Sequence, residues 1–349
     1  MEKIIIQTAD SVSGILVGGR WEAVVKLLPR TGAVIITDDN VFDIYGASFP
    51  SFPVLKIKPG EGSKQLKVIE SLAKKLLKAG IDRSGFILAI GGGVVCDIAG
   101  FLASIFMRGI PFGYVSTSLL SQVDASTGGK NGVNLGGIKN VIGNFRQPEF
   151  VICDTTMLRT LPDDEYLSGL GELIKTGIIG DKSIIEMLEN DQSGILGRDR
   201  NVLSALVSKA VKYKASVVAR DEKESGLRRV LNFGHTYGHA IEVYKEVKHG
   251  YAVASGMELA AFWSFEKGFI GKEEYLRIKN LLERYHLSDE IDIPAEKIEE
   301  LVIHDKKKSG NDLNFVFIKG LGKPVVKKVP LAEVIDFYRR TIKGKKSEI

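Results

Sequence analysis

The feature that most constrains the fold of this chain is an apolar run, residues 85–107, whose only charge is Asp97. A membrane-spanning helix takes ~20 apolar residues, so the run is long enough to be one. Three successive glycines, Gly91, Gly92 and Gly93, interrupt it, however, and a carboxylate near the centre of a span is costly in lipid. The run therefore predicts a buried strand at residues 86–90, a tight turn at the glycines and a buried helix, with no membrane span.

The segments around this turn alternate between two kinds of pattern. Short β-branched runs predict strands at residues 33–37, 54–57 and 86–90, and apolar residues at helical spacing predict a helix at 65–79. Strands interleaved with helices are typical of a doubly wound, mainly parallel sheet. The first part of the chain is therefore expected to be an α/β domain.

Beyond about residue 158 the pattern changes to long helical segments. They are expected at residues 165–177, 202–218, 235–246, 252–267 and 273–285. A chain of 349 residues also favours two domains, because single cores stop growing near ~250–300 residues. We therefore predict an α/β domain at 1–158 and a mostly α-helical domain at 159–349.

Charge and cysteine content limit the classes of partner and compartment. The net charge is +5, from 48 basic and 43 acidic side chains, which is too mild for a nucleic-acid-binding protein with a basic stripe. The two cysteines, Cys96 and Cys153, have no CxxC spacing, and the N-terminus has no signal-peptide pattern. These observations favour a cytoplasmic protein with reduced thiols that binds neither nucleic acid nor membrane.

The glycine turn has two interpretations. A strand that runs into glycines and a helix N-terminus exposes backbone N–H groups that can bind a pyrophosphate. Asp38 and Asp39 follow an earlier strand, where carboxylates can bind ribose hydroxyls. The pattern is not GxGxxG, however, and the acidic pair precedes the glycines by about 50 residues instead of following them by ~20. From the residues alone, a structural turn is as good an interpretation as a nucleotide site.

Three of the five histidines lie within fifteen residues of one another. His235 and His239 are four apart on one helix face, and His249 is expected in a loop that leads into another helix. Upstream, Glu172 and Lys175 are three apart on a helix. Imidazoles plus one carboxylate suit a catalytic zinc or a similar divalent ion. Spacing alone would select His235 and His239 as the ligand pair.

A set of basic residues lies beside glycines or near these motifs. Each alone is best explained as a solvated charge, but together they could bind phosphate and carboxylate oxygens. The set therefore implies a small, multiply anionic substrate. Its members are Arg108, Lys130, Lys139, Lys175, Lys214, Arg228 and Lys306.

Taken in this order, three segments of the chain resemble the 3-dehydroquinate synthase family of sugar phosphate cyclases, and the resemblance extends from about Asp38 to Gly322. The resemblance implies a nucleotide-binding α/β domain, a helical C-terminal domain, an active site between them and a homodimer. The segments are Gly91-Gly92-Gly93-Val94-Val95-Cys96-Asp97, Leu119-Leu120-Ser121-Gln122-Val123-Asp124 followed by Gly128-Gly129-Lys130, and Asn232-Phe233-Gly234-His235-Thr236-Tyr237-Gly238-His239.

The resemblance also implies a role for individual residues. It assigns a divalent metal, zinc or cobalt, to Glu172, His235 and His249, so that His239 faces the substrate, against the choice made from spacing. It implies NAD contacts from Asp38, Glu61, Lys64, Gly91, Gly92, Gly93, Val94, Asp97, Thr117, Ser118, Lys130, Lys139, Thr160, Leu161 and Glu165. It implies catalytic roles for Asp124, Lys130, Lys175, Asn232 and His239, and substrate contacts from Arg108, Lys139, Asn140, Lys214, Arg228 and Lys306.

The reaction that the resemblance implies is a step of aromatic amino-acid synthesis, the shikimate pathway. It converts 3-deoxy-arabino-heptulosonate 7-phosphate into 3-dehydroquinate and phosphate. The steps are, in order, oxidation by NAD, elimination of phosphate, reduction, ring opening and an intramolecular aldol closure. Because NAD is regenerated, the implied enzyme is a carbon–oxygen lyase and not a net oxidoreductase.

The chain departs from the family pattern at three positions. Tyr251 stands where the family usually has a glutamate, Ser118 where a second threonine is common, and Cys96 where a glycine is common. A lost carboxylate beside a ligand can weaken metal binding. Our hypothesis is that Tyr251 is tolerated and that metal affinity depends mainly on the three ligands.

Three alternative functions remain open from the sequence. Another sugar phosphate cyclase, such as a valiolone or inosose synthase, would differ at substrate-contacting positions, whereas Asn232, His239 and Lys306 fit the dehydroquinate pattern. A metal-dependent polyol dehydrogenase would leave the basic set without an anionic partner, and would consume NAD⁺ in bulk. A non-catalytic binding protein would not need Glu172 and both of its histidines.

Overall fold

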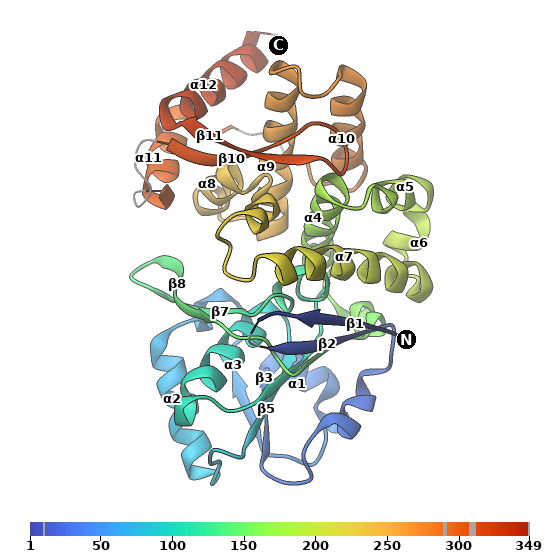
Figure 1. The fold of residues 1–349 in the computed structure, drawn as a ribbon, viewed down its shortest axis with the longest axis vertical. Coiled ribbons are helices and arrows are strands. Elements are labelled where there is room, and N and C mark those ends of the chain that lie inside the picture. The colour runs from blue at the N-terminus through green and yellow to red at the C-terminus, as the bar shows by residue number, and fades with distance from the viewer. Residues whose placement is uncertain (10, 289–291, 307–311, 348–349) are drawn as a thin grey trace. The chain divides into compact units, whose positions relative to one another are not determined.

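The computed structural model describes residues 1–9, 11–288, 292–306 and 312–347, which form two compact units (Figure 1). The first unit contains Met1–Pro162 together with Gly194–Lys223. The second contains Asp163–Ser193 together with Glu224–Ile349. The change of sequence pattern near residue 158 therefore lies close to the first division, and one later helical segment packs with the first unit.

A seven-stranded sheet forms the centre of the first unit. Only β1 and β2 are antiparallel, and every other neighbouring pair is parallel. The predicted doubly wound, mainly parallel sheet is confirmed, and so are the strands predicted at residues 33–37, 54–57 and 86–90. In spatial order the strands are β1 (Glu2–Gln7), β2 (Val12–Val17), β9 (Phe150–Cys153), β6 (Phe112–Ser116), β5 (Phe86–Gly91), β3 (Ala33–Asp38) and β4 (Val54–Ile57).

The longer helices of the first unit are α2 (Leu66–Lys78), α3 (Gly93–Ile105) and α7 (Arg200–Arg220). Every residue of β5 and most of α3 are buried, which explains the apolar run without a membrane. Among the described residues, no helix combines the length and the apolar character that crossing a membrane requires. The shorter elements are α1 (Asp39–Tyr45), η1 (Trp21–Leu27), η2 (Gly46–Ser48), η3 (Glu61–Ser63), η4 (Phe106–Arg108), the π-helical turn η5 (Ser121–Ala125), η6 (Thr155–Thr160), and the hairpin strands β7 (Lys130–Leu135) and β8 (Ile138–Phe145).

The order of the parallel strands creates a switch point between β3 and β5. The chain leaves β3 through α1 toward β4 on one side, and leaves β5 through α3 toward β6 on the other. Because parallel strands end at the same edge, Asp38 at the end of β3 and Gly91 at the end of β5 lie at this edge, with Ser116 paired to Gly91. Doubly wound sheets bind ligands in the crevice at such a point.

The second unit is mostly α-helical, as predicted, and its described residues include one hairpin that was not predicted. His249 is the first residue of α9, not part of a loop as expected. The helices are α4 (Asp163–Ile179), α5 (Lys182–Asn190), η7 (Leu227–Asn232), α8 (His235–Lys245), α9 (His249–Glu266), α10 (Lys272–Arg284), α11 (Ala295–Lys306) and α12 (Leu331–Ser347); the hairpin strands are β10 (Asp312–Ile318) and β11 (Pro324–Pro330); and α6 (Gln192–Leu196) lies where the chain passes between the units.

Candidate metal centre and cofactor site

Glycines allow α4 and α9 to approach closely in the second unit. A Cβ atom on Gly250 would lie 1.8 Å from the Ser168 carbonyl oxygen, and one on Gly171 would lie 2.5 Å from the Gly250 carbonyl oxygen. Any other residue would push the two helices apart. This contact places Glu172, the residue after Gly171, beside His249, the residue before Gly250.

A second close contact positions the start of α8 against α9. Gly234 has a φ of +80°, and a Cβ atom on it would lie 2.6 Å from Met257 Cγ. A Cβ atom on Gly256 would lie 2.0 Å from the Gly234 carbonyl oxygen. His235 follows this turn as the first residue of α8, so its imidazole is held next to α9.

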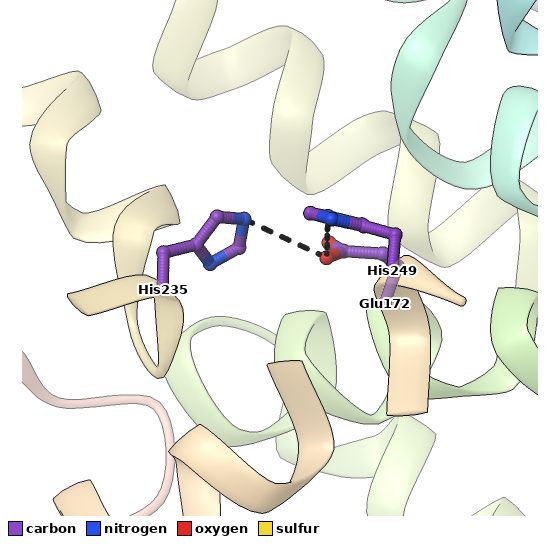
Figure 2. Close-up of side chains that lie close together, drawn as sticks. All are labelled: Glu172, His235 and His249. Carbon is purple, nitrogen blue, oxygen red and sulfur yellow. Dashed lines mark ion pairs between the residues drawn. The ribbon is translucent and has the colours of Figure 1, made fainter. Parts of the chain in front are cut away.

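The three helices bring Glu172, His235 and His249 together (Figure 2). One ligand atom from each lies within 4.8 Å of the others. His235 Nε2 is 3.7 Å and His249 Nε2 is 3.3 Å from Glu172 Oε1. His239, which spacing alone would have paired with His235, is not in this group, and its ring centroid lies 5.2 Å from that of His235, edge to face.

The chemistry of the three residues fits a divalent metal. Both carboxylate oxygens of Glu172 are buried: Oε2 pairs with Lys175, and Oε1 faces the Nε2 atoms of both histidines. A buried charge is costly unless it is paired or coordinates a metal. Two imidazole nitrogens and one carboxylate oxygen are the ligand set of catalytic zinc sites that keep a position open for substrate. Glu172, His235 and His249 could therefore hold such an ion.

Lys175 sets the charge state of this cluster from one turn further along α4. It forms an ion pair with Glu172 Oε2, and both side chains are almost completely buried. Burial alone would raise the pKa of Glu172, but the charge of Lys175 and the hydrogen bond from His249 hold that pKa well below its usual range. Burial, together with the charge of Lys175, lowers the pKa of His235 well below its usual value. Glu172 thus stays ionised and His235 neutral, the forms that bind metals.

Both ligand histidines have an acceptor at the nitrogen that faces away from Glu172. His235 Nδ1 is 3.1 Å from the Phe233 carbonyl oxygen, and His249 Nδ1 is 3.0 Å from Glu242 Oε2. Burial would lower the pKa of His249, but the carboxylates of Glu172 and Glu242 raise it to about 9. The sequence analysis missed Glu242, although its position seven residues after His235 places it on the same face of α8.

The remaining predicted residues of the second unit lie around this cluster or on its flanking elements. Asn232 ends η7 and donates to Glu224 Oε1 at 2.6 Å, and Arg228 on the same element is buried. Glu165, predicted to contact NAD, pairs with Lys248, the residue before His249. Lys306 is the last residue of α11, and its side chain lies outside the part of the chain that the structure describes.

In the first unit, the three glycines form the tight turn between β5 and α3. Gly91 ends the strand, Gly92 caps the helix and Gly93 begins it. A Cβ atom on Gly92 would lie 3.2 Å from Ser118 Oγ, and one on Gly93 would lie 3.1 Å from Ala125 Cβ. The bare backbone at the start of a thirteen-residue helix fits a pyrophosphate, whose charge the helix dipole favours.

Asp38 lies at the end of β3, the strand next to the glycine turn. Its Oδ1 accepts a hydrogen bond from Val41 N at 2.9 Å, which caps α1. Burial raises the pKa of this carboxyl group, and the hydrogen bonds from Val41 and Asn40 oppose that rise. Asp38 and the glycines therefore meet at the switch point, the arrangement that a ribose and a pyrophosphate require.

Lys64 connects several of the predicted cofactor residues. It is 3% exposed, and its Nζ donates to Asp97 Oδ2 at 2.7 Å and to Asn140 Oδ1 at 2.5 Å. Glu61 Oε1 lies 3.7 Å from the same nitrogen and accepts from Asn134 at 2.8 Å. Burial would lower the pKa of Lys64, but the charges of Asp97 and Glu61 raise it, so Lys64 stays charged and compensates for the carboxylate of α3.

Lys214 on α7 reaches η5 within the first unit. Its Nζ donates to the Asp124 carbonyl oxygen at 2.8 Å and to Asp124 Oδ1 at 2.5 Å. Other predicted residues make backbone or hydroxyl contacts: Thr117 N donates to the Gly91 carbonyl oxygen, Thr160 Oγ1 lies 2.7 Å from Tyr45 Oη, and the Leu161 carbonyl oxygen accepts from Arg198. The exposed members of the predicted set are Arg108, Lys130, Lys139, Asn140 and Thr160.

Comparisons with known proteins agree with this geometry. A family model described as 3-dehydroquinate synthase N-terminal matches residues 54–168, and one described as 3-dehydroquinate synthase C-terminal matches residues 169–308. The 3-dehydroquinate synthase of Solibacter usitatus is 40% identical over 311 residues, 86% of this chain and 87% of that protein. The 3-dehydroquinate synthase of Thermoanaerobacter pseudethanolicus is 41% identical over 332 residues, 91% of this chain and 93% of that protein.

A solved structure supports the fold. A 2-deoxy-scyllo-inosose synthase, complexed with carbaglucose-6-phosphate, NAD⁺ and Co²⁺, superposes with a TM-score of 0.87 at 25% identity, covering 97% of this chain and all of that one. The two family models together cover more than half of the sequence, and the relatives cover nearly all of it. This chain therefore belongs to the 3-dehydroquinate synthase family.

Proposed function

We propose that this chain converts 3-deoxy-arabino-heptulosonate 7-phosphate into 3-dehydroquinate and phosphate, using NAD and one divalent metal ion, zinc or cobalt. The convergence of Glu172, His235 and His249 in a family member carries the proposal. Two 3-dehydroquinate synthases are 40% and 41% identical to the chain, whereas the inosose synthase is 25% identical. This difference favours the dehydroquinate reaction over another sugar phosphate cyclase.

The proposed metal ligands are Glu172 Oε1 or Oε2 and the Nε2 atoms of both histidines. The proposed NAD site is the glycine turn with Asp38, Glu61, Lys64 and Asp97, and Lys64 links this site to Asn140, a proposed substrate contact. That the inosose synthase is complexed with NAD⁺ and Co²⁺ supports both assignments. When bound, NAD⁺ would accept and return one hydride, and the metal would make the substrate hydroxyl more acidic.

The basic residues would bind and orient the anionic substrate. Arg108, Lys130 and Lys139 are exposed, and such side chains form strong charge-assisted hydrogen bonds with phosphate oxygens. They would hold the phosphate while its C–O bond breaks, so that the phosphate itself accepts the proton that the neighbouring carbon loses. A neutral polyol offers these charges no partner, which favours the cyclase over a polyol dehydrogenase.

Three residues of the second unit would act beside the proposed metal ligands: Lys175, His239 and Asn232. Lys175 is buried one turn from Glu172, where it would orient the carboxylate and exclude water from its far side. His239 lies one turn after His235 on α8, so its imidazole would bind or exchange a proton with a substrate hydroxyl. Asn232 would orient the substrate by hydrogen bonding, from the element that leads into α8.

The proposed activity is tested by measuring phosphate released from 3-deoxy-arabino-heptulosonate 7-phosphate with less NAD⁺ than substrate. We expect more phosphate than the NAD⁺ supplied, because the cofactor is regenerated, and none after a chelator has removed the metal. Metal-replete protein that releases no phosphate would contradict the proposal, and stoichiometric NADH formation from a polyol would favour the dehydrogenase.

The assembly and the compartment are proposals of the same kind. From the family resemblance, we propose that the chain acts as a homodimer in the cytoplasm. Sedimentation velocity of the purified chain tests the assembly, and a single species with the mass of one chain, 38.2 kDa, would exclude the dimer under those conditions. Fractionation of the source cells tests the compartment.

A further inference from the structure

The contact between Glu242 and His249 has no role in the function proposed so far. Glu242 lies two turns after His235 on α8, and its side chain is 13% exposed. Its Oε2 is 3.0 Å from His249 Nδ1, while His249 Nε2 lies 3.3 Å from Glu172 Oε1 on the other side of the ring. The imidazole of His249 thus lies between two carboxylates.

This arrangement determines which nitrogen of His249 would bind a metal. A carboxylate only accepts hydrogen bonds, so both ring nitrogens, each of which faces a carboxylate, carry protons in the metal-free protein. A metal held by Glu172 would replace the proton on Nε2, whereas Nδ1 would keep its proton and donate a hydrogen bond to Glu242. His235 Nδ1 faces the backbone carbonyl oxygen of Phe233 in the same way, so only the support of His249 depends on a side chain.

We propose that Glu242 is a positioning residue that fixes the orientation and tautomer of His249, so that metal affinity depends on it although it is not a ligand. The inference rests on the proposed function, because it requires that Glu172, His235 and His249 bind a metal. It also bears on Tyr251, which stands where the family usually has a glutamate. In this chain a carboxylate contacts His249 from α8, the neighbouring helix.

The size of the effect follows from metal sites in general. A carboxylate that accepts the second N–H of a ligand histidine makes the imidazole more basic and holds its ring in place. Loss of such a partner typically lowers metal affinity ~10–100-fold. Glu242→Met, which keeps the length of the side chain and removes the acceptor, should have an effect of this size. Glu242→Gln, which keeps an acceptor oxygen without the charge, should lie between Glu242→Met and wild type.

The experiment measures the Co²⁺ and Zn²⁺ affinities of the full chain by chelator competition. Glu246→Gln is the matched control, because it removes an acidic charge beside the C-terminal end of α8 from an exposed side chain. We expect its affinity to equal that of wild type. The visible absorption spectrum of bound Co²⁺ should change in Glu242→Met and not in the control. A purely structural role of Glu242 would not produce this spectral change.

Each outcome has a defined meaning. If wild type binds no metal, the proposed function is contradicted, and this inference loses its basis. If wild type binds metal and folded Glu242→Met binds it equally well, this inference alone is overturned. Should Glu242→Met fail to fold, histidine ¹⁵N spectra of zinc-loaded wild type decide the question, with His249→Gln identifying the resonances. A protonated Nδ1 on His249 supports the inference, and zinc on Nδ1 overturns it.

Discussion

The glycine turn of the first unit and the metal centre of the second both depend on glycine, but for opposite reasons. At the turn, Gly92 and Gly93 leave backbone N–H groups bare, so that a ligand can contact the main chain itself. At the metal centre, Gly171 and Gly250 contact each other's helices and not a ligand, and they allow side chains from α4 and α9 to converge. One site is thus built from backbone atoms and the other from side chains.

Backbone and side-chain sites tolerate different changes. A backbone site accepts variation in neighbouring side chains, such as Cys96 and Ser118, where family members commonly have glycine and threonine. A side-chain site depends on the charge of each member and on what supports it. The following predictions test that distinction.

The largest effect is expected for Glu172→Gln, which removes a charge from the side-chain site. Lys175 would lose the carboxylate with which it pairs, and breaking a buried ion pair by removing one partner costs ~3–5 kcal/mol. Urea unfolding of metal-free protein measures this loss. Glu165→Gln, on the same helix, breaks the more exposed pair with Lys248 and should cost at most about 1 kcal/mol. Equal losses in the two variants would contradict the prediction.

Lys64→Met tests whether side chains also matter around the backbone site. It removes the hydrogen bonds to Asp97 and Asn140, and each bond to a charged group contributes ~1.5–3 kcal/mol. We expect a loss of stability of at least one such bond, ~1.5–3 kcal/mol, and weaker NAD binding, measured by urea unfolding and by fluorescence titration. Lys74→Met, which breaks an exposed pair with Glu70, should leave both quantities unchanged.

Gly92→Ala fills the turn with a single methyl group. The backbone of Gly92 is in an extended conformation that alanine adopts freely, so the fold should persist. The added carbon would occupy the space beside Ser118 and weaken NAD binding by about tenfold, ~1.4 kcal/mol, without changing metal affinity. Gly271→Ala, at a helix cap where a Cβ atom meets nothing within 4 Å, is the control. Undiminished NAD binding by Gly92→Ala would argue against a nucleotide at the turn.

The smallest effect concerns the two thiols of the first unit. Burial raises the pKa of Cys153 to about 12 and that of Cys96 well above its usual value. The thiolate is the reactive form, so almost none is present at pH 8. We expect iodoacetamide to leave the folded protein unlabelled over a period in which it labels the unfolded protein completely. Rapid labelling of folded protein would mean that the helix carrying Cys96 opens readily.

Much of the fold could be predicted from local patterns. Three strands were predicted from β-branched runs and six helices from helical periodicity, and each lies within a few residues of its predicted bounds. The buried strands β6 and β9 and the helices α11 and α12 were not predicted. The hairpin β7–β8 was missed although Gly136 and Gly137 form a two-residue turn that is typical of hairpins. Periodicity also shows how much of a helix is buried, but not against which element it packs.

The candidate site was less accessible from the residues themselves. Spacing predicts that His235 and His239 share a helix face, but not that this face presents only His235 to Glu172. The convergence depends on two long-range helix contacts, at Gly171–Gly250 and at Gly234–Gly256, which no local pattern reveals. The three ligands were predicted from the family resemblance, and the contact between Glu242 and His249 was found only in the structure.

The path of the chain between the two units has a consequence for synthesis in the cell. The chain passes from one unit to the other three times, and α7, with Lys214, returns to the first unit after α4 and α5 have been made. The first unit therefore lacks a helix until Lys223 has left the ribosome, when nearly two thirds of the chain have been translated. Truncation after residue 162 should expose the apolar surface that α7 covers, so the first unit cannot complete its fold before α4 and α5 of the second unit have been made.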